Sequence, residues 1–437
     1  LTSLGVLSCL YIAKNEPLLS EQYGFISGWE QVLISGILIL ITLEMARRTV
    51  GWPLPVIALL FLIYGLIGDK VPGEFGHAGI PVNSFLGTLI ITEGGLWGKL
   101  TGVSVSIVAV FVIFGAVLNA GEAGQGFMNI AIAAAGRLTG GAAKVSVISS
   151  ALFGSISGSA SANVASTGMV TLPAMRRLGY PKRIAGAVEA VASTGGQIMP
   201  PLMGAGAFVM VELTGIPYTQ IIIAALIPAV LYFVTIWFGV NRYARLYDLK
   251  PYDDQMLPEV AIVIKTSLFF FIPFAVLLTF MYLGYTPQFS AAIAILSASF
   301  LLFVDINLRF DWKKTRSRLA HAAVFSGQQV ATIASIILCA SLIVGVLGIT
   351  GLGIKVTSTI LTLSGENLWL ALILTALACI ILGMEVPTTA AYVICVSVAG
   401  PALIDLGLKP LLVTYYTHNY TETGEANLKN IGDSIGV

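Results

Sequence analysis

Residues 155–180 read SISGSASANVASTGMVTLPAMRRLGY, and residues 383–408 read GMEVPTTAAYVICVSVAGPALIDLGL. The two stretches align without a gap at an offset of 228 residues and share the pattern Pro-Ala-x-x-x-Leu-Gly. Each is a small, hydroxyl-rich interruption of an apolar run. Inside a bilayer every backbone polar group must be satisfied, so helices are interrupted at that depth chiefly where the freed groups face protein or a bound solute. Two interruptions at corresponding places therefore predict a transporter site.

The composition identifies an integral membrane protein surrounded by the lipid bilayer. The chain has 437 residues, of which 57% are hydrophobic and 10% are charged, too few polar groups to cover a soluble surface. The net charge of +1 argues against nucleic acid as a partner. Cys9, Cys339, Cys379 and Cys395 lie in or beside apolar segments without paired ligand spacing, which favours buried thiols over a disulfide or a metal site.

Apolar runs predict the membrane-spanning segments and the fold class. We expect an all-α polytopic membrane protein with inverted repeats, two re-entrant helical hairpins and discontinuous helices. The hairpins are expected at 145–180 and 368–408, a broken span at 184–212, and interfacial helices at 121–144 and 353–366. The predicted spans are 30–46, 53–68, 102–120, 219–240, 264–284, 288–306 and 327–349, with residues 1–13 as the remnant of another.

Basic residues set the expected orientation. If Arg47 and Arg48 are cytoplasmic, most other Lys and Arg residues fall on the same side, as the positive-inside rule requires. The span at 102–120 then runs inward, whereas its counterpart at 327–349 runs outward. The two repeats are therefore predicted to be inverted, with one hairpin entering from each face of the membrane.

The first hairpin tip, residues 155–163, is rich in oxygen ligands. Hard cations such as sodium bind neutral or anionic oxygens, which an unwound tip supplies from carbonyl, hydroxyl and amide groups. The alternative is small-residue helix packing, with each Ser bonded back to its own helix. The candidate residues are Ser155, Ser157, Gly158, Ser159, Ser161 and Asn163.

The second tip has the same design. Pro387 is expected to break or begin a helix, and the positive end of that helix is a natural place for a carboxylate ligand. The candidates there are Gly383, Glu385, Pro387, Thr388 and Thr389. Glu385 is a functional candidate because an ionisable group at membrane depth is costly. A position in a water-filled vestibule or beside a cation explains a glutamate there equally well.

A third group of candidates lies in the broken span. One half-helix is expected to end, and another to start at Pro200-Pro201, which frees backbone groups to face the first hairpin. Glu189 and Glu212 are expected to cap or brace this span. The candidate binding residues are Ser193, Thr194, Gly195, Gly196, Gln197, Pro200 and Pro201.

Enzymatic chemistry has little support in the sequence. No Gly-x-x-x-x-Gly-Lys-Ser/Thr loop occurs. His77, His321 and His418 lie far apart, without metal-ligand or catalytic-triad spacing. The chain is therefore predicted to be no enzyme and to need no cofactor.

Three stretches resemble the large membrane subunit of tripartite ATP-independent periplasmic (TRAP) transporters. They are ASANVASTGMVTLPAMRRLGYPK (160–182), AGAVEAVASTGGQIMPPLMGAGAFVMVELTGIPY (185–218) and PTTAAYVI (387–394). The resemblance covers nearly the whole chain to about residue 412. It is nearest to fused small-plus-large membrane proteins of the TAXI type. Compared with them, this chain is expected to be truncated at both ends.

The resemblance implies an elevator-type secondary transporter driven by a sodium gradient. An extracytoplasmic binding protein delivers its substrate, an organic acid or an amino acid, to a multi-pass protein of the bacterial or archaeal cytoplasmic (inner) membrane. In that family the hairpin tips and facing broken helices hold sodium and substrate. The sodium candidates here are Ser159, Asn163, Thr194, Gly383, Thr388 and Thr389.

The resemblance also predicts how the chain is divided. Residues 1–98 would be small-subunit scaffold helices, 99–240 the first transport repeat, 241–320 linker and scaffold, 321–412 a second, incomplete repeat, and 413–437 a polar tail. Two departures stand out: Glu385 replaces a usual Gly, and polar residues 423–429 occupy the place of a second broken helix. The competing hypothesis is a channel-like or structural membrane protein without ion-coupled transport.

Overall fold

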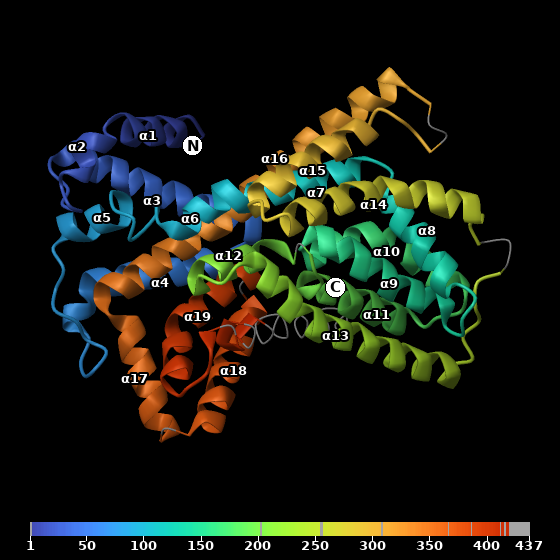
Figure 1. Cartoon of the computed structure of the whole chain (residues 1–437). Helices are drawn as coiled ribbons and strands as arrows, with labels where there is room; N and C mark the ends of the chain where they lie inside the picture. The colour runs from blue at the N-terminus through green and yellow to red at the C-terminus, as the bar shows by residue number, and fades with distance from the viewer. Residues whose placement is uncertain are drawn as a thin grey trace. The chain divides into compact units, whose positions relative to one another are not determined.

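The structure is a computed structural model and is almost entirely helical. It describes residues 2–201, 203–253, 257–306, 309–365, 367–385, 387–410, 412–414 and 417–418, without the side chains of Met384 and Glu385. In those ranges the other regular element is one antiparallel bridge between Val304 and Phe310, and seven helices are long and apolar enough to cross a membrane (Figure 1). The prediction of an all-α polytopic membrane protein is confirmed.

The chain divides into two compact units. The first comprises residues 1–105, 212–214 and 331–425, and the second comprises residues 106–211, 215–330 and 426–437. The long helix α16 (Trp312–Thr350) contributes to both.

The first unit surrounds a core made by helices from both ends of the chain. Leu38, Leu62 and Phe85 pack against Leu342 and Val346 of α16. Gly65 lies so close to Phe85 that an added Cβ would be 2.4 Å from its ring. The helices are α1 (Thr2–Lys14), α2 (Glu16–Ser20), α3 (Trp29–Val50), α4 (Pro53–Ile67), α5 (Val82–Ile90), α6 (Lys99–Val103), α17 (Leu352–Ser364), α18 (Leu368–Glu385) and α19 (Thr388–Asp405).

The second unit contains the first predicted hairpin and the predicted broken span. Its core packs small residues such as Ala131, Ala142 and Ala192 against Met175 and Tyr180, which lets helix backbones approach closely. The helices are α7 (Ala109–Ala120), α8 (Ala123–Ala135), α9 (Gly141–Ser157), α10 (Ala160–Arg177), α11 (Lys182–Gly195), α12 (Gly204–Thr214), α13 (Tyr218–Leu246), α14 (Val260–Tyr282) and α15 (Pro287–Leu301).

Most predicted spans match helices, and two of them need correction. The predicted span 288–306 ends at Leu301, because a turn follows in which Arg318 and Thr315 satisfy the carbonyls of Leu302 and Val304. The predicted span 327–349 begins much earlier, at Trp312. Asp311 starts that helix, since its Oδ1 accepts hydrogen bonds from the amides of Lys313 and Lys314 at 2.9 and 3.2 Å.

Arg318 ties three segments of the second unit together. Its guanidinium forms an ion pair with Glu122, at the start of α8, and donates to the Val304 carbonyl at 2.9 Å. Only 16% of the Arg318 side chain and 19% of the Glu122 side chain are exposed, so screening by water is limited.

We expect Arg318→Ala to lower the free energy of unfolding by about 3 kcal/mol, because it removes the cation paired with Glu122 and the side-chain donor to the Val304 carbonyl in a poorly hydrated site. Thermal unfolding of the purified chain in detergent measures this. Arg316→Ala, an exposed arginine on the same helix, is the control and should change stability by less than about 0.5 kcal/mol. Equal effects of the two substitutions would contradict the role given to Arg318.

Candidate functional site

The first hairpin is formed by α9 and α10, which pack against each other and against α11 (Figure 1). Gly158 ends α9 with a φ of 58°, a backbone conformation that favours glycine. Ser159 begins α10 by accepting a hydrogen bond from the Ala162 amide at 3.3 Å. The expected nine-residue unwound tip is therefore wrong: in residues 155–163 only Gly158 and Ser159 leave the helices.

The tip hydroxyls divide into two groups. Ser155 is buried and donates to the Leu152 carbonyl at 2.7 Å, as the packing alternative expected. Ser159 and Ser161 lie with their Oγ atoms 3.1 Å apart, and Ser157 donates to the Ser159 carbonyl at 3.5 Å. The accessible oxygens of the tip are thus those of residues 157–161.

The predicted broken span is interrupted in the structure. Helix α11 ends at Gly195, residues 196–198 form a 3₁₀ turn, and α12 starts at Gly204. The second half therefore does not begin at Pro200-Pro201 as predicted, because Met203 and Gly204 have φ angles of 50° and 67° and regular helix resumes only after them.

The hairpin tip packs directly on this interruption through two pairs of glycines. A Cβ added to Gly154 would lie 2.2 Å from the Cα of Gly196, and one added to Gly158 would lie 2.1 Å from the Cα of Gly204. No side chain fits at such distances, so the two backbones are in direct contact. The expected juxtaposition of the hairpin with the broken span is present within this unit.

Asn163 lies at that contact and is fully buried. Its Nδ2 donates to the carbonyls of Ser150 and Ser193, at 2.9 and 3.2 Å. The opposite amide orientation would place Oδ1 against those two acceptors, so the network fixes the assignment. Oδ1 is buried and has no hydrogen-bond partner among the described residues. An amide oxygen in that position is a suitable ligand for a hard cation.

Glu189 joins the two arms of the hairpin to α11. It is 1% exposed and accepts hydrogen bonds from Ser146 of α9, at 2.8 Å, and from Thr167 and Thr171 of α10. None of the described basic side chains forms an ion pair with it. The carboxyl group therefore braces three helices through hydroxyl groups, as its predicted role requires.

Sequence reasoning missed the hydroxyl partners of Glu189, although a signal was present. Asn163, Thr167 and Thr171 recur every four residues and so share one face of α10. Ser150 extends the polar contact, since its Oγ lies 3.3 Å from Thr167 Oγ1 and 3.4 Å from Ser193 Oγ. We call the residues Ser146, Ser150, Asn163, Thr167, Thr171, Glu189 and Ser193 the polar seam.

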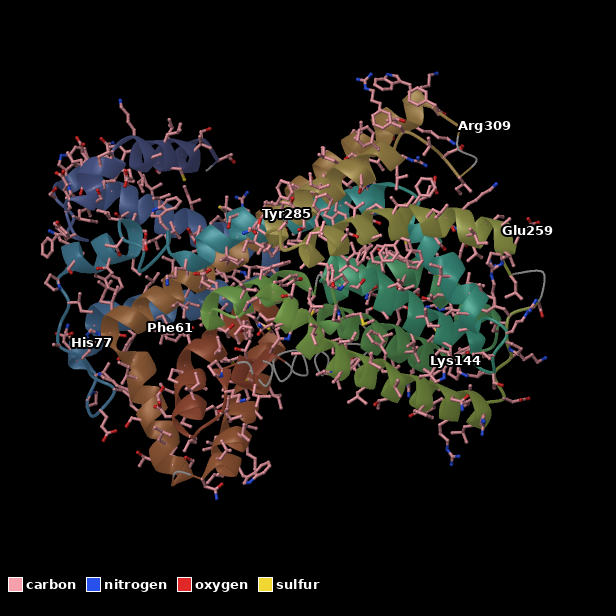
Figure 2. The ribbon with its side chains drawn as sticks, in the orientation of Figure 1. Phe61, His77, Lys144, Glu259, Tyr285 and Arg309 are labelled. Atoms are coloured by element: carbon pink, nitrogen blue, oxygen red, sulfur yellow. The ribbon has the colours of Figure 1, made fainter. Side chains whose placement is uncertain are left out.

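The open end of the hairpin is held separately. Lys144, labelled in Figure 2, donates to Asn241 of α13 at 3.1 Å and lies 4.9 Å from the centroid of the Trp237 ring. Tyr180, in the loop after α10, accepts a hydrogen bond from the Ala143 amide at 3.5 Å. Burial raises the pKa of Tyr180 to about 12, so its hydroxyl stays neutral at physiological pH.

The other candidates of the broken span lie in the wall behind the tip. Thr194 is buried and donates to the Ala190 carbonyl at 2.9 Å, and Gln197 is also buried. Gly195 makes room for the ring of Tyr232, and Tyr218 donates to the Pro201 carbonyl. The hydroxyl of Thr194 is thus engaged by its own helix. At this position the broken span can offer an ion its backbone groups rather than the Thr194 side chain.

The second hairpin consists of α18 and α19 in the other unit. Gly383 and Thr388 are buried, and Pro387 and Thr389 are partly exposed at the start of α19. The Glu385 side chain and Val386 lie outside the described residues, as do residues 419–437, so the predicted absence of a second broken helix at 423–429 stays a prediction. Val413, Thr414, Thr417 and His418, at the start of the predicted polar tail, are helical and buried.

The polar seam is not repeated in the second hairpin. At the offset of 228, the counterparts of Asn163, Thr167 and Thr171 are Ala391, Cys395 and Ala399, and those of Ser146 and Ser150 are Leu374 and Ala378. The two hairpins therefore share a backbone design but differ in chemistry.

Comparison with known proteins identifies the family. Residues 37–427 match the family described as tripartite ATP-independent periplasmic transporter, DctM component. The chain belongs to this TRAP transporter family. The expected resemblance is confirmed, and the protein is a multi-pass protein of the bacterial cytoplasmic membrane whose family consists of transporter permeases.

The curated relatives are moderately similar. The C4-dicarboxylate TRAP transporter large permease protein DctM of Pseudomonas aeruginosa is 26% identical over 306 residues, 69% of each chain. The 2,3-diketo-L-gulonate TRAP transporter large permease protein YiaN of Escherichia coli is 23% identical over 313 residues, 70% of this chain and 71% of the relative. An ectoine/5-hydroxyectoine TRAP transporter large permease from Ruegeria pomeroyi is 26% identical over 200 residues, 45% of this chain and 44% of the relative.

We expect Gly154→Ala to destabilise the hairpin, because the added methyl would overlap Gly196 and force the backbones apart. The expected loss of unfolding free energy is about 2 kcal/mol, measured by thermal unfolding in detergent. Gly239→Ala is the control, since nothing lies within 4 Å of its added Cβ in α13. If Gly154→Ala lost no more unfolding free energy than the control Gly239→Ala, the direct backbone contact would be refuted.

We expect Glu189→Ala to destabilise the second unit by about 3 kcal/mol, because Ser146 loses its acceptor, Thr167 and Thr171 keep only backbone carbonyls as acceptors, and a cavity forms. Glu212→Ala removes a partly exposed glutamate and should cost less than about 1 kcal/mol. Urea unfolding of the purified chain compares the two. Equal losses would show that Glu189 does not brace the three helices.

Proposed function

We propose that this chain is the membrane permease of a sodium-coupled secondary transporter that imports an organic acid or an amino acid by alternating access. An extracytoplasmic binding protein would deliver the substrate. The observation that carries the proposal is the buried, unpartnered Oδ1 of Asn163 at the contact between a hairpin tip and a helix interruption.

The tip fits sodium by its chemistry. The tip carries neutral amide, hydroxyl and carbonyl oxygens, and no metal-binding group of three or more His, Cys, Asp or Glu residues occurs among the described residues. Sodium binds such neutral oxygens, whereas transition metals prefer imidazole or thiolate ligands. Asn163 would supply a side-chain ligand, and the ends of α9 and α11 would supply carbonyls.

The substrate class rests on the family and on the relatives. Those relatives are named for C4-dicarboxylates, 2,3-diketo-L-gulonate and ectoine, and two of these three names denote organic acids. The positive end of α19 would hold a substrate carboxylate, and the hydroxyls of Thr388 and Thr389 beside it would bind sodium. Elevator movement and the TAXI subtype are further parts of the proposal.

Uptake by proteoliposomes tests the proposed function. With purified chain and its binding protein, an inward sodium gradient should drive accumulation of labelled substrate, and replacing sodium with choline should abolish it. A leak that does not depend on sodium would favour a channel-like protein instead.

Sodium-dependent stabilisation tests the assigned ligands. We expect sodium to raise the melting temperature of the wild-type chain, because an ion that binds only the folded state stabilises it. Asn163→Ala and Thr389→Val should reduce that shift by more than half. Ser149→Ala is the control, since its hydroxyl bonds to the Ser146 carbonyl away from the tip. Equal losses in all three variants would count against these ligands.

A further inference from the structure

The turn between α15 and α16 is held rigidly at the surface of the second unit. Val304 and Phe310 form an antiparallel bridge. Two side chains of α16 donate to nearby carbonyls, Arg318 to that of Val304 and Thr315 to that of Leu302. Figure 2 shows Arg309 beside this turn. The described residues on either side of the turn are thus joined to each other and to α16.

Three aromatic rings cluster on the turn. Phe303, Phe310 and Trp312 have ring centroids 6.2 to 6.4 Å apart. Phe310 is 64% exposed and Trp312 is 59% exposed. An exposed aromatic cluster directly after the apolar helix α15 is typical of the level of lipid headgroups.

Basic residues surround these rings. Arg309, Lys313 and Arg316 are exposed and take part in none of the ion pairs recorded among the described residues. The nearby acids are already engaged: Asp305 lies 3.9 Å from Lys314, and Asp311 accepts from two backbone amides. The surface therefore has an excess of positive charge.

We propose that Arg309, Phe310, Trp312, Lys313 and Arg316 form a binding surface for anionic phospholipid headgroups. The aromatic rings enter the interfacial region while the three cations contact lipid phosphates. The orientation predicted from basic residues places this aromatic–basic surface on the cytoplasmic side. Charge complementarity selects an anionic lipid rather than a zwitterionic one.

Fluorescence quenching by brominated lipids tests the proposal with the full chain in liposomes. The signal of Trp312 is the difference between the wild type and Trp312→Phe, which separates it from the other Trp residues. At equal mole fraction, brominated phosphatidylglycerol should quench Trp312 about twice as strongly as brominated phosphatidylcholine, and added salt should reduce the difference.

The variant Arg309→Gln/Lys313→Gln/Arg316→Gln should remove that preference. The control Arg176→Gln/Arg177→Gln/Arg183→Gln removes three other exposed charges from the same unit and should keep it. Single Lys313→Glu provides a milder test with an expected partial loss. Equal preference in all variants would overturn the proposal, and so would abolition of the preference by millimolar inorganic phosphate, which would indicate a site for free phosphate.

Discussion

The first hairpin depends on the hydrogen bonds that the Glu189 carboxyl group accepts. This group accepts hydrogen bonds from both arms, Ser146 on α9 and Thr167 and Thr171 on α10, while its own backbone belongs to α11. At 1% exposure water cannot replace these donors, so separating the helices would leave several polar groups unsatisfied. The three helices therefore behave as one body.

This body fixes the position of Asn163. The hydroxyl of Thr167, one turn further along α10, lies within hydrogen-bond distance of both Glu189 and the Asn163 carbonyl, which share its one proton. The Asn163 amide donates to carbonyls of α9 and α11. The glycine contacts bring the hairpin turn onto the interruption after α11. Oδ1 is thus held in place by the same network that joins the helices, and this network would pre-organise it for the proposed sodium ion.

The sequence predicted the helices, hairpins and interruptions because apolar runs and their Gly, Ser and Pro breaks reflect a backbone constraint of the bilayer. Local detail was harder to predict. The tip is nearly all helix because Gly158 alone can make the turn, and α12 starts late because Met203 and Gly204 adopt positive φ.

The polar seam was missed because its residues look like small packing residues until three helices bring them together. The two hairpins also looked equivalent, but the seam residues of the first correspond to Ala, Cys and Leu in the second.

Hydrogen–deuterium exchange of the purified chain in sodium and in choline tests the central claim most directly. If Asn163 and the neighbouring helix ends bind sodium, the amides of residues 154–163 and 193–198 should exchange several-fold more slowly in sodium. The amides of α14 serve as the internal reference and should not change. Identical exchange of the tip in both salts would contradict a sodium site at the hairpin.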